Sequence, residues 1–404
     1  MNAQLTDTDR GQLRRALELA GLGRGRVSPN PLVGAVLVRD GDVIGEGWHA
    51  ELGGLHAERA ALADCRERGE DPRGATMYVT LEPCAHQGRQ PPCTEAILEA
   101  GIARVVIASD DPSEKASGRG PGMLRDGGVE VEFAAGEEAA AARLLNQPFR
   151  KHARTGLPLV TLKMAMSLDG RTTTQPGDSP WISGEQSREL VHRWRSESDA
   201  IAVGIGTVLA DDPQLTARPQ VASGMRNVRI ATIRHTGSAI RQPIRIVFDR
   251  LARLPLDSQL LRTLDQSPVL VVVSSTADSS HLDALRGAGA EILVADDIDA
   301  ALADLGRRGV TSLFLEGGQT LAAAFITADQ LDEARTFIAP VLLGGENVPR
   351  AGGAVGGPTP EDALATGGGG GSPAVTGPAR RTPLSHAVKT VGDDVLITAR
   401  FKEW

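Results

Sequence analysis

Two apolar stretches separated by a turn dipeptide open the hydrophobic pattern of this chain. They cover residues 32–38 and 43–48 and flank Asp40-Gly41. An Asp-Gly pair tolerates the positive φ angles of a tight turn, so the pattern predicts a β-hairpin. An amphipathic helix is predicted next over residues 56–68, and Gly69 ends it.

A strand, a helix and a second strand are predicted after this hairpin and helix. Their expected bounds are residues 76–81, residues 93–100 with Gly101 as the stop, and residues 104–109. The order of hairpin, helix, strand, helix and strand predicts a small layered α/β fold for the N-terminal part.

The C-terminal part alternates strand-like apolar runs with helical ones. The expected strands cover residues 159–164, 200–203, 244–248, 269–273, 291–294 and 312–315, with a closing strand at 394–400. This alternation predicts a mostly parallel sheet covered by helices. Such a sheet commonly binds a nucleotide at the C-terminal ends of its strands.

Two segments interrupt the pattern. Residues 143–158 carry two prolines and a glycine among cations, and we place a domain boundary near Pro148, which gives domains of residues 1–147 and 148–404. Residues 351–382 are so rich in Gly and Pro that they predict a flexible surface insert. Two domains are expected because 404 residues exceed what one hydrophobic core usually organises.

Charge and cysteine content exclude several classes of protein. The formal net charge of -8, without a dense Lys/Arg block, argues against a general nucleic-acid binder. No apolar run resembles a signal peptide or a membrane span, so we expect a cytoplasmic protein with no membrane partner. The 3 cysteines are too few for a disulfide framework, and we expect Cys65 to be a buried free thiol.

A His-x-Glu motif followed by two Pro-Cys dipeptides is the strongest chemical signal. His56, Cys84 and Cys93 offer one imidazole and two thiolates, which can hold a tetrahedral Zn²⁺ with its fourth position open. The predicted helix starts at His56 and Cys93 favour an anionic thiolate there. Glu58 can accept a proton from activated water and deliver it to a leaving amine. The set predicts hydrolytic deamination of an amino-substituted heterocycle.

Two alternatives remain for this motif. One is a nucleobase, nucleoside or polynucleotide-base deaminase with an unrelated C-terminal domain, although the cysteines lie further apart than the usual Cys-x-x-Cys. The aromatic content of 3% also disfavours capture of a flipped base. The other is a binding protein in which zinc only stabilises the fold.

The local signals in the C-terminal half are weaker. Gly204-Ile205-Gly206 follows a predicted strand but lacks the third glycine of a dinucleotide fingerprint. Gly317-Gly318 lies between the strand at 312–315 and a predicted helix at 321–326, which leaves backbone N–H groups able to meet a phosphate. On this pattern alone, a plain structural turn is equally consistent.

Longer stretches of sequence resemble a known family. Residues 30–34, 47–49, 56–58, 78–93, 163–171, 181–183, 206–218 and 315–318 carry the resemblance, which is to the bifunctional riboflavin-biosynthesis deaminase-reductase family (RibD). The long insert between the two Pro-Cys dipeptides, with its central Gly88, is specific to that family among zinc deaminases. The resemblance implies a cytidine-deaminase-like three-layer N-terminal domain and a dihydrofolate-reductase-like C-terminal α/β domain.

The resemblance also implies two consecutive reactions on one phosphorylated pyrimidine. The N-terminal domain, with one Zn²⁺ per chain, would hydrolyse the 2-amino group of 2,5-diamino-6-(5-phosphoribosylamino)pyrimidin-4(3H)-one. The C-terminal domain would use NADPH to reduce the ribosyl group to ribityl, which gives 5-amino-6-(5-phosphoribitylamino)uracil. We expect this small molecule as the partner, no nucleic acid or membrane, and a homo-oligomer.

The same resemblance assigns site residues. In the deaminase pocket these are Asn30 and His49. For NADPH they are Ala165, Trp181, Thr207, Asp211, Gly317, Gly318, Gln319 and Thr320. For the reductase substrate they are Lys163, Ser179, Arg195, Leu215, Arg218 and Glu316. Arg195 and Arg218 are expected to bind the substrate phosphate as guanidinium forks. Ser113 and Arg250 depart from the family pattern, which has Asn and a small polar residue there.

Overall fold

The structure is a computed structural model that describes residues 5–88, 90–114, 116, 118–173, 181–218, 241–344 and 381–404. The chain folds as two compact α/β units. Unit 1 comprises Met1–Leu159, Leu305–Thr311 and Glu403–Trp404, and unit 2 comprises Val160–Asp304 and Ser312–Lys402. The predicted insert at 351–382 lies, as far as residue 380, outside the described residues.

Unit 1 is built on a five-stranded sheet of order β2-β1-β3-β4-β5. The predicted hairpin is confirmed: β1 and β2 pair antiparallel, and Asp40 and Gly41 in the turn have φ angles of 54° and 90°. The strand β3 pairs antiparallel with β1 and parallel with β4, which pairs parallel with β5. The bounds are β1 Gly34–Arg39, β2 Asp42–Trp48, β3 Thr76–Val79, β4 Arg104–Ile107 and β5 Glu130–Phe133.

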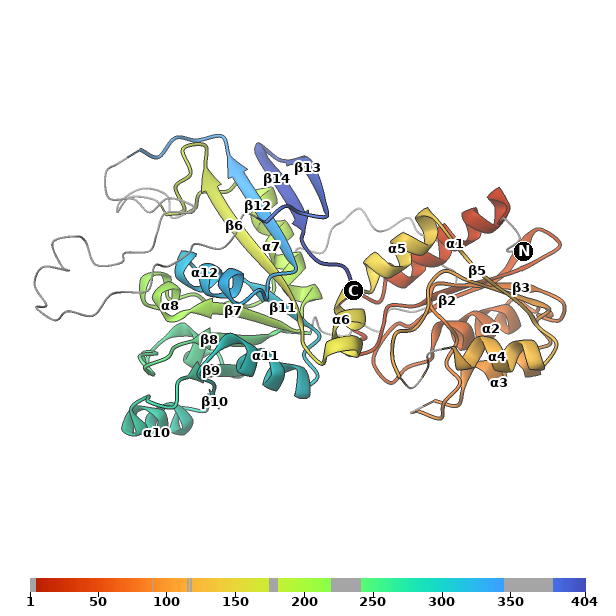
Figure 1. Ribbon diagram of the computed structural model, residues 1–404, viewed down its shortest axis with the longest axis horizontal. Helices are drawn as coiled ribbons and strands as arrows, with labels where there is room; N and C mark the ends of the chain where they lie inside the picture. The colour runs from red at the N-terminus through yellow and green to blue at the C-terminus, as the bar shows by residue number, and fades with distance from the viewer. Residues whose placement is uncertain are drawn as a thin grey trace, which may run out of the picture. The chain divides into compact units, whose positions relative to one another are not determined.

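Helices cover both faces of this sheet, which confirms the expected three-layer domain. In Figure 1, α1 and α5 lie on one face, and α2, α3 and α4 lie on the other. A buried apolar cluster that includes Leu37, Met77 and Ile97 fills the space under α2 and α3. The bounds are α1 Asp7–Gly21, α2 Ala57–Glu67, α3 Cys93–Glu99, α4 Arg119–Asp126, α5 Glu137–Leu145 and α6 Gln147–Thr155.

Helix starts position two of the predicted metal ligands. Cys93 is the first residue of α3, as predicted. His56 is the N-cap of α2, one residue before the predicted first turn, because its backbone is still extended with φ −70° and ψ 158°. Cys65 is buried on α2 as a free thiol, which confirms the prediction for it.

The segment interpreted as the domain boundary is largely helical. Pro148 lies in the first turn of α6, where the helix needs no N–H donor. Gly156, with φ 72°, ends the helix in the left-handed conformation. The helix belongs to unit 1, so the division between units follows Leu159, beyond the predicted boundary at residues 147 and 148. That boundary between the two activities stays a prediction.

Unit 2 contains a nine-stranded sheet of order β10-β9-β8-β7-β11-β6-β12-β14-β13. The strands β7 to β10 pair in parallel with their neighbours, as β11 does with β7 and β12 with β6, which confirms a mostly parallel sheet. The last strands, β12, β14 and β13, pair antiparallel. The bounds are β6 Leu159–Ser167, β7 Ala200–Gly204, β8 Ile244–Phe248, β9 Val269–Val273, β10 Glu291–Val294, β11 Ser312–Leu315, β12 Glu333–Ala339, β13 Ser385–Val391 and β14 Asp394–Arg400.

Six helices accompany this sheet in the described part of unit 2. They are α7 Glu185–Glu197, α8 Ile205–Asp211, α9 Gln259–Arg262, α10 Ser279–Gly287, α11 Ile298–Arg307 and α12 Gln319–Thr327. A second apolar cluster, which includes Trp194, Phe314 and Phe337, forms the core of this unit. No helix in the described ranges is both long enough and apolar enough to cross a bilayer.

Gly47 sets how closely α2 approaches β2. A Cβ atom at this position would lie 2.2 Å from the backbone N of Ala61 and 2.7 Å from the carbonyl O of Ala57. We expect Gly47→Ala to lower the free energy of unfolding by about 1–3 kcal/mol, because the helix must move away from the strand.

Gly11→Ala on α1 is the matched control. No atom lies within 4 Å of its added Cβ, and alanine is the better helix former. Denaturant unfolding that gives both variants the same stability would contradict this account.

The carboxylate of Asp9 ties α1 to the sheet. It accepts hydrogen bonds from Nη1 of Arg104 at 2.7 Å, from the hydroxyl of Tyr78 at 2.8 Å and from Oγ1 of Thr6 at 2.6 Å. Burial opposes ionisation of Asp9, but these bonds together hold its pKa well below the ordinary value.

This lowered pKa makes the contribution of Asp9 depend on pH. A lowered folded-state pKa means that the stabilisation is complete above the unfolded-state pKa of about 3.9 and is lost as the pH falls below it. Asp9→Asn is therefore expected to lower the free energy of unfolding by about 1–3 kcal/mol at neutral pH. The difference between variant and parent should shrink in acid. Denaturant unfolding at about pH 7 and about pH 3 measures it, and a difference that stays constant would be the contrary result.

Candidate active sites

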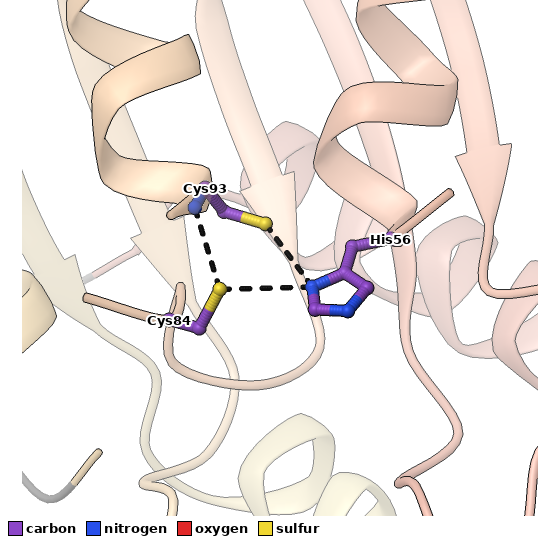
Figure 2. Close-up of side chains that lie close together, drawn as sticks. All are labelled: His56, Cys84 and Cys93. Carbon is purple, nitrogen blue, oxygen red and sulfur yellow. Dashed lines mark hydrogen bonds between the residues drawn. The ribbon is translucent and has the colours of Figure 1, made fainter. Parts of the chain in front are cut away.

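Three side chains from separate segments of unit 1 converge on one point (Figure 2). His56 caps α2, Cys84 lies in the loop after β3, and Cys93 begins α3. Nδ1 of His56 is 3.6 Å from Sγ of Cys84 and 3.4 Å from Sγ of Cys93. All three ligand atoms lie within 4.8 Å of one another. The structure thus brings together the three predicted metal ligands.

These distances fit a tetrahedral zinc site. Zn–S bonds of about 2.3 Å and Zn–N bonds of about 2.0–2.1 Å, at the tetrahedral angle, place nitrogen and sulfur about 3.6 Å apart. One imidazole and two thiols are also the ligand types that zinc prefers. Three protein ligands leave a fourth position for water or substrate, as in catalytic rather than structural zinc sites.

The electrostatics of the three ligands favours a bound cation. The hydrogen bond with Cys93 is the largest of the effects that lower the pKa of Cys84 to about 4, and His56 lowers it further. The same bond raises the pKa of Cys93, so the two sulfurs share one negative charge. The hydrogen bond with Cys84 raises the pKa of His56. A dication among these atoms would allow both sulfurs to be thiolates.

Glu58 is the second residue of α2, and it is 3% exposed. It lines a cavity of about 460 Å³ together with His56 and Cys84. Burial, and then the negative charge of Cys84, raise the pKa of Glu58 to about 7. A carboxyl group near this pKa can both accept and return a proton at neutral pH.

Asn30 and His49 line the same cavity and contact each other. Nδ1 of His49 lies 2.9 Å from the carbonyl O of Leu55, so Nδ1 carries the hydrogen, because a carbonyl can only accept. Burial lowers the pKa of His49, which keeps the ring neutral. Its Nε2 therefore accepts a hydrogen bond from Nδ2 of Asn30, at 3.1 Å.

Further residues line this cavity without a role predicted from sequence: Glu82, His86, Asp111 and Phe149. Ser113, which departs from the family pattern, also lines it, and its backbone N donates to Oδ1 of Asp111 at 2.8 Å. Glu82 and His86 lie within residues 78–93, which carry the family resemblance, so the sequence could have indicated them as site residues. Phe149 comes from α6, and it was missed because that segment was interpreted as a domain boundary.

In unit 2, three of the predicted substrate-binding residues, Lys163, Arg195 and Glu316, form a half-buried charge cluster. Nε and Nη2 of Arg195 donate to the two carboxylate oxygens of Glu316, at 2.6 and 3.0 Å. Burial opposes ionisation of Glu316, but Arg195 and then Lys163 lower its pKa. Burial lowers the pKa of Lys163 as well. The remaining Nη1 of Arg195 donates to the carbonyl O of Thr216, so in this structure its guanidinium fork is already engaged.

His192 joins this cluster and was missed by the sequence analysis. It precedes Arg195 by three residues on α7, and its Nδ1 accepts a hydrogen bond from the backbone N of Arg218 at 3.3 Å. Burial, and then the charges of Arg195 and Arg218, lower its pKa. The i, i+3 spacing on a helix was the signal that could have indicated it.

The segment from Asp212 to Arg218 holds Leu215 in a conformation unusual for leucine, with φ 54° and 3% exposure. Two polar side chains fix this segment. The Gln242 amide exchanges two hydrogen bonds with the backbone of Ala217, at 2.8 and 2.9 Å. The guanidinium of Arg245, fully buried on β8, donates to the carbonyl O of Gln214 at 3.2 Å.

The structure brings some of the predicted cofactor residues together. Gly318 is the N-cap of α12, and a Cβ atom on it would lie 3.8 Å from Oγ1 of Thr207. Gln319 and Thr320 begin the helix, and Nε2 of Gln319 donates to Oγ1 of Thr172 at 3.0 Å.

The other predicted residues of unit 2 lie in varied surroundings. Ala165 packs against the apolar core, and Gly317 follows β11 closely, where an added Cβ atom would lie 2.8 Å from Cδ2 of Leu321. Trp181 is 62% exposed beside the Arg188 guanidinium. Asp211, Arg218 and Arg250 are exposed. Ser179 lies outside the described residues.

Two family models match the chain. The cytidine and deoxycytidylate deaminase zinc-binding region matches residues 6–109. The RibD C-terminal domain matches residues 158–361. The second match overturns the alternative of a deaminase with an unrelated C-terminal domain.

Relatives and solved structures agree with these matches. A riboflavin biosynthesis protein RibD of Actinobacillus pleuropneumoniae is 40% identical over 351 residues, which covers 85% of this chain and 87% of the relative. RibD of Acinetobacter baumannii, form 1, superposes with a TM-score of 0.78 at 34% identity, covering 98% of this chain and 99% of that chain. A diaminohydroxyphosphoribosylaminopyrimidine deaminase/5-amino-6-(5-phosphoribosylamino)uracil reductase from Thermotoga maritima gives a TM-score of 0.76 at 32% identity, with the same coverage.

Proposed function

Because the chain belongs to the RibD family of riboflavin-biosynthesis deaminase-reductases, we propose that each unit catalyses one of two consecutive reactions. Unit 1 hydrolyses the 2-amino group of 2,5-diamino-6-(5-phosphoribosylamino)pyrimidin-4(3H)-one. Unit 2 then reduces the ribosyl group with NADPH to give 5-amino-6-(5-phosphoribitylamino)uracil. The observation that carries the proposal is the His56, Cys84 and Cys93 triangle, which opens on the same cavity as Glu58.

The deamination follows from the groups in this cavity. The three ligands would hold Zn²⁺, which lowers the pKa of coordinated water from about 15.7 toward about 7. Glu58 takes up a proton and delivers it to the departing nitrogen, so that ammonia leaves rather than an amide anion. Asn30 and His49 are the proposed contacts of the pyrimidine: Nε2 of His49 orients the Asn30 amide, and the rest of that amide is left to hydrogen-bond the pyrimidine. The contact with Leu55 fixes the tautomer of His49 before the substrate arrives.

For the reductase, we propose that the NADPH phosphates bind the backbone N–H groups at the start of α12, where the helix dipole favours an anion. The proposed cofactor contacts are Gly317, Gly318, Gln319, Thr320, Ala165, Trp181, Thr207 and Asp211. The proposed substrate contacts are Lys163, Ser179, Arg195, Leu215, Arg218 and Glu316. Because Glu316 occupies the Arg195 fork, the exposed Arg218 is the better candidate for the substrate phosphate.

The cytoplasmic location and the homo-oligomeric state stay predictions. A phosphorylated pyrimidine as substrate fits the family, and the assignment of deamination to unit 1 and reduction to unit 2 follows the two family models.

Two signals from one preparation test the proposed function. We expect the full-length protein, given the diaminopyrimidinone ribotide, to release ammonia with or without NADPH. It should oxidise NADPH only after deamination has supplied the uracil ribotide. When NADPH is present, ammonia release without NADPH oxidation, or oxidation of NADPH without ammonia release, would refute the bifunctional proposal.

Substitutions of Glu58 and Lys163 should separate the two signals. Glu58→Gln is expected to slow ammonia release by about 10²–10⁴-fold, because an amide cannot carry the proton. It should leave the zinc content unchanged, and reduction of separately supplied uracil ribotide should continue. Lys163→Met is expected to impair only the reduction, because it removes a cation from the charge cluster of unit 2. A variant that loses both activities while it remains folded would contradict the assignment.

Cysteine substitutions test the metal. Cys93→Ser is expected to reduce bound zinc from about one ion per chain to well below that, because the site keeps only two of its three ligands. Cys65→Ser is the matched control, since Cys65 is buried on α2 with its Sγ 3.5 Å from the carbonyl O of Glu70. Elemental analysis of both purified variants gives the answer. Equal zinc contents would rule out the proposed ligand set.

A further inference from the structure

The helix α6 contacts two loops that line the deaminase cavity, and Asn146 makes the first contact. Asn146 is the N-cap of α6 and is 2% exposed. Its Oδ1 accepts from the backbone N of Leu32 at 2.8 Å, and its Nδ2 donates to the carbonyl O of Leu32 at 2.9 Å. Because Leu32 follows Asn30 by two residues, this pair of bonds fixes the loop that carries Asn30 into the cavity.

Arg150 makes the second contact, from one turn further along α6. It is 2% exposed, and its Nη1 donates to the carbonyl O of Asp110 at 2.8 Å and to Oγ of Ser109 at 3.2 Å. Nη2 donates to Oδ2 of Asp110 at 3.3 Å. The next residues, Asp111 and Ser113, line the cavity. Arg150 therefore holds the loop after β4 as Asn146 holds the loop before β1.

Trp404 accepts a hydrogen bond from the third nitrogen of the Arg150 guanidinium. Nε of Arg150 donates to the carbonyl O of Trp404 at 2.7 Å. The side-chain amide of Gln147 accepts from the backbone N of Trp404 at 2.9 Å and donates to its carbonyl O at 3.1 Å. The ammonium of Lys151 lies 5.3 Å from the centre of the Trp404 ring. Figure 1 shows this end of the chain, marked C, beside α6.

Trp404 belongs to a different unit from the strand that precedes it in sequence. Glu403 and Trp404 belong to unit 1, whereas the strand β14 that leads to them belongs to unit 2. A guanidinium has five N–H donors and is costly to bury without acceptors. Removing the Trp404 carbonyl leaves Nε of Arg150 without that acceptor. We expect the Arg150 side chain to rotate toward other acceptors, which breaks its hydrogen bonds to Asp110.

We propose that Asn146, Arg150 and Trp404 are positioning residues for deamination, which act by fixing the loops at residues 29–33 and 109–113 around the cavity. This proposal rests on the proposed deaminase function of unit 1. None of the three residues lines the cavity, so each acts through the residues that it holds. The last residues of the described chain thereby support a reaction at the other end of the sequence.

The test uses the full chain, an Arg150→Met variant and a variant that ends at Lys402. For both variants we expect kcat/KM for ammonia release to fall by about 10- to 100-fold, because misplaced binding groups lose near-attack geometry. KM is expected to rise, zinc content to stay at the parent value, and reduction of supplied uracil ribotide to continue at the parent rate. Arg154→Met, on an exposed position of the same helix, is the control and should retain the parent kcat/KM.

Two further measurements separate positioning from loss of stability. When both changes are combined, the loss in kcat/KM should be no larger than the greater single loss, because they break the same chain of contacts. Hydrogen exchange of residues 29–33 and 109–113 should speed up in Arg150→Met while the central strands stay protected. If Arg150→Met does not fold, Arg150→Lys keeps the charge without the fork, and the same loss in kcat/KM is expected of it.

The outcomes distinguish this inference from the proposed function. If the parent chain releases no ammonia from the ribotide, the proposed function fails. If the parent is active and both folded variants keep its kcat/KM, the function stands and the positioning role is refuted. Losses in kcat/KM that add in the combined variant would also refute it, because they would indicate that Arg150 and Trp404 act independently.

Discussion

The convergence of two sulfur atoms and one imidazole nitrogen on a single point is the constraint on which unit 1 depends. His56 comes from the connection after β2, and Cys84 and Cys93 come from the connection after β3, so strand β3 and helices α2 and α3 must keep their spacing for the three atoms to meet. Gly47 allows the necessary contact between α2 and β2, and the helix starts put His56 and Cys93 at the same end of the layer. The apolar core under these helices therefore serves the chemistry as well as the stability of the fold.

Elements with a clear pattern of hydrophobic and polar positions were predictable from sequence, and so were the site residues that lie in them. The hairpin around Asp40-Gly41 and six of the strands of unit 2 matched because their apolar runs have clear ends. The strand β13 was missed because nearly all its side chains are exposed, which removes the alternation that marks a strand. The helix α6 was missed because Pro148 was interpreted as a break, although a proline fits the first turn of a helix.

Residues that act through contacts between segments distant in sequence could not be identified from the sequence alone. The metal ligands could be found because their residue types and order carry the chemistry. Phe149 and His192 could be placed only when the fold brought α6 to the cavity and α7 to the charge cluster. The structure also shows a partner of Arg195 that the sequence did not indicate, while its role in phosphate binding stays a prediction. Its fork is satisfied by Glu316, a pairing between residues far apart in sequence that composition and spacing do not reveal.

The placement of Trp404 has a consequence for how the protein is made. A ribosome synthesises α6 and the whole sheet of unit 1 long before it reaches residues 403 and 404. During translation, Nε of Arg150 must therefore bind water in place of the Trp404 carbonyl until the strands of unit 2 have been produced. Unit 1 therefore completes its own structure only after residues 403 and 404 have been synthesised.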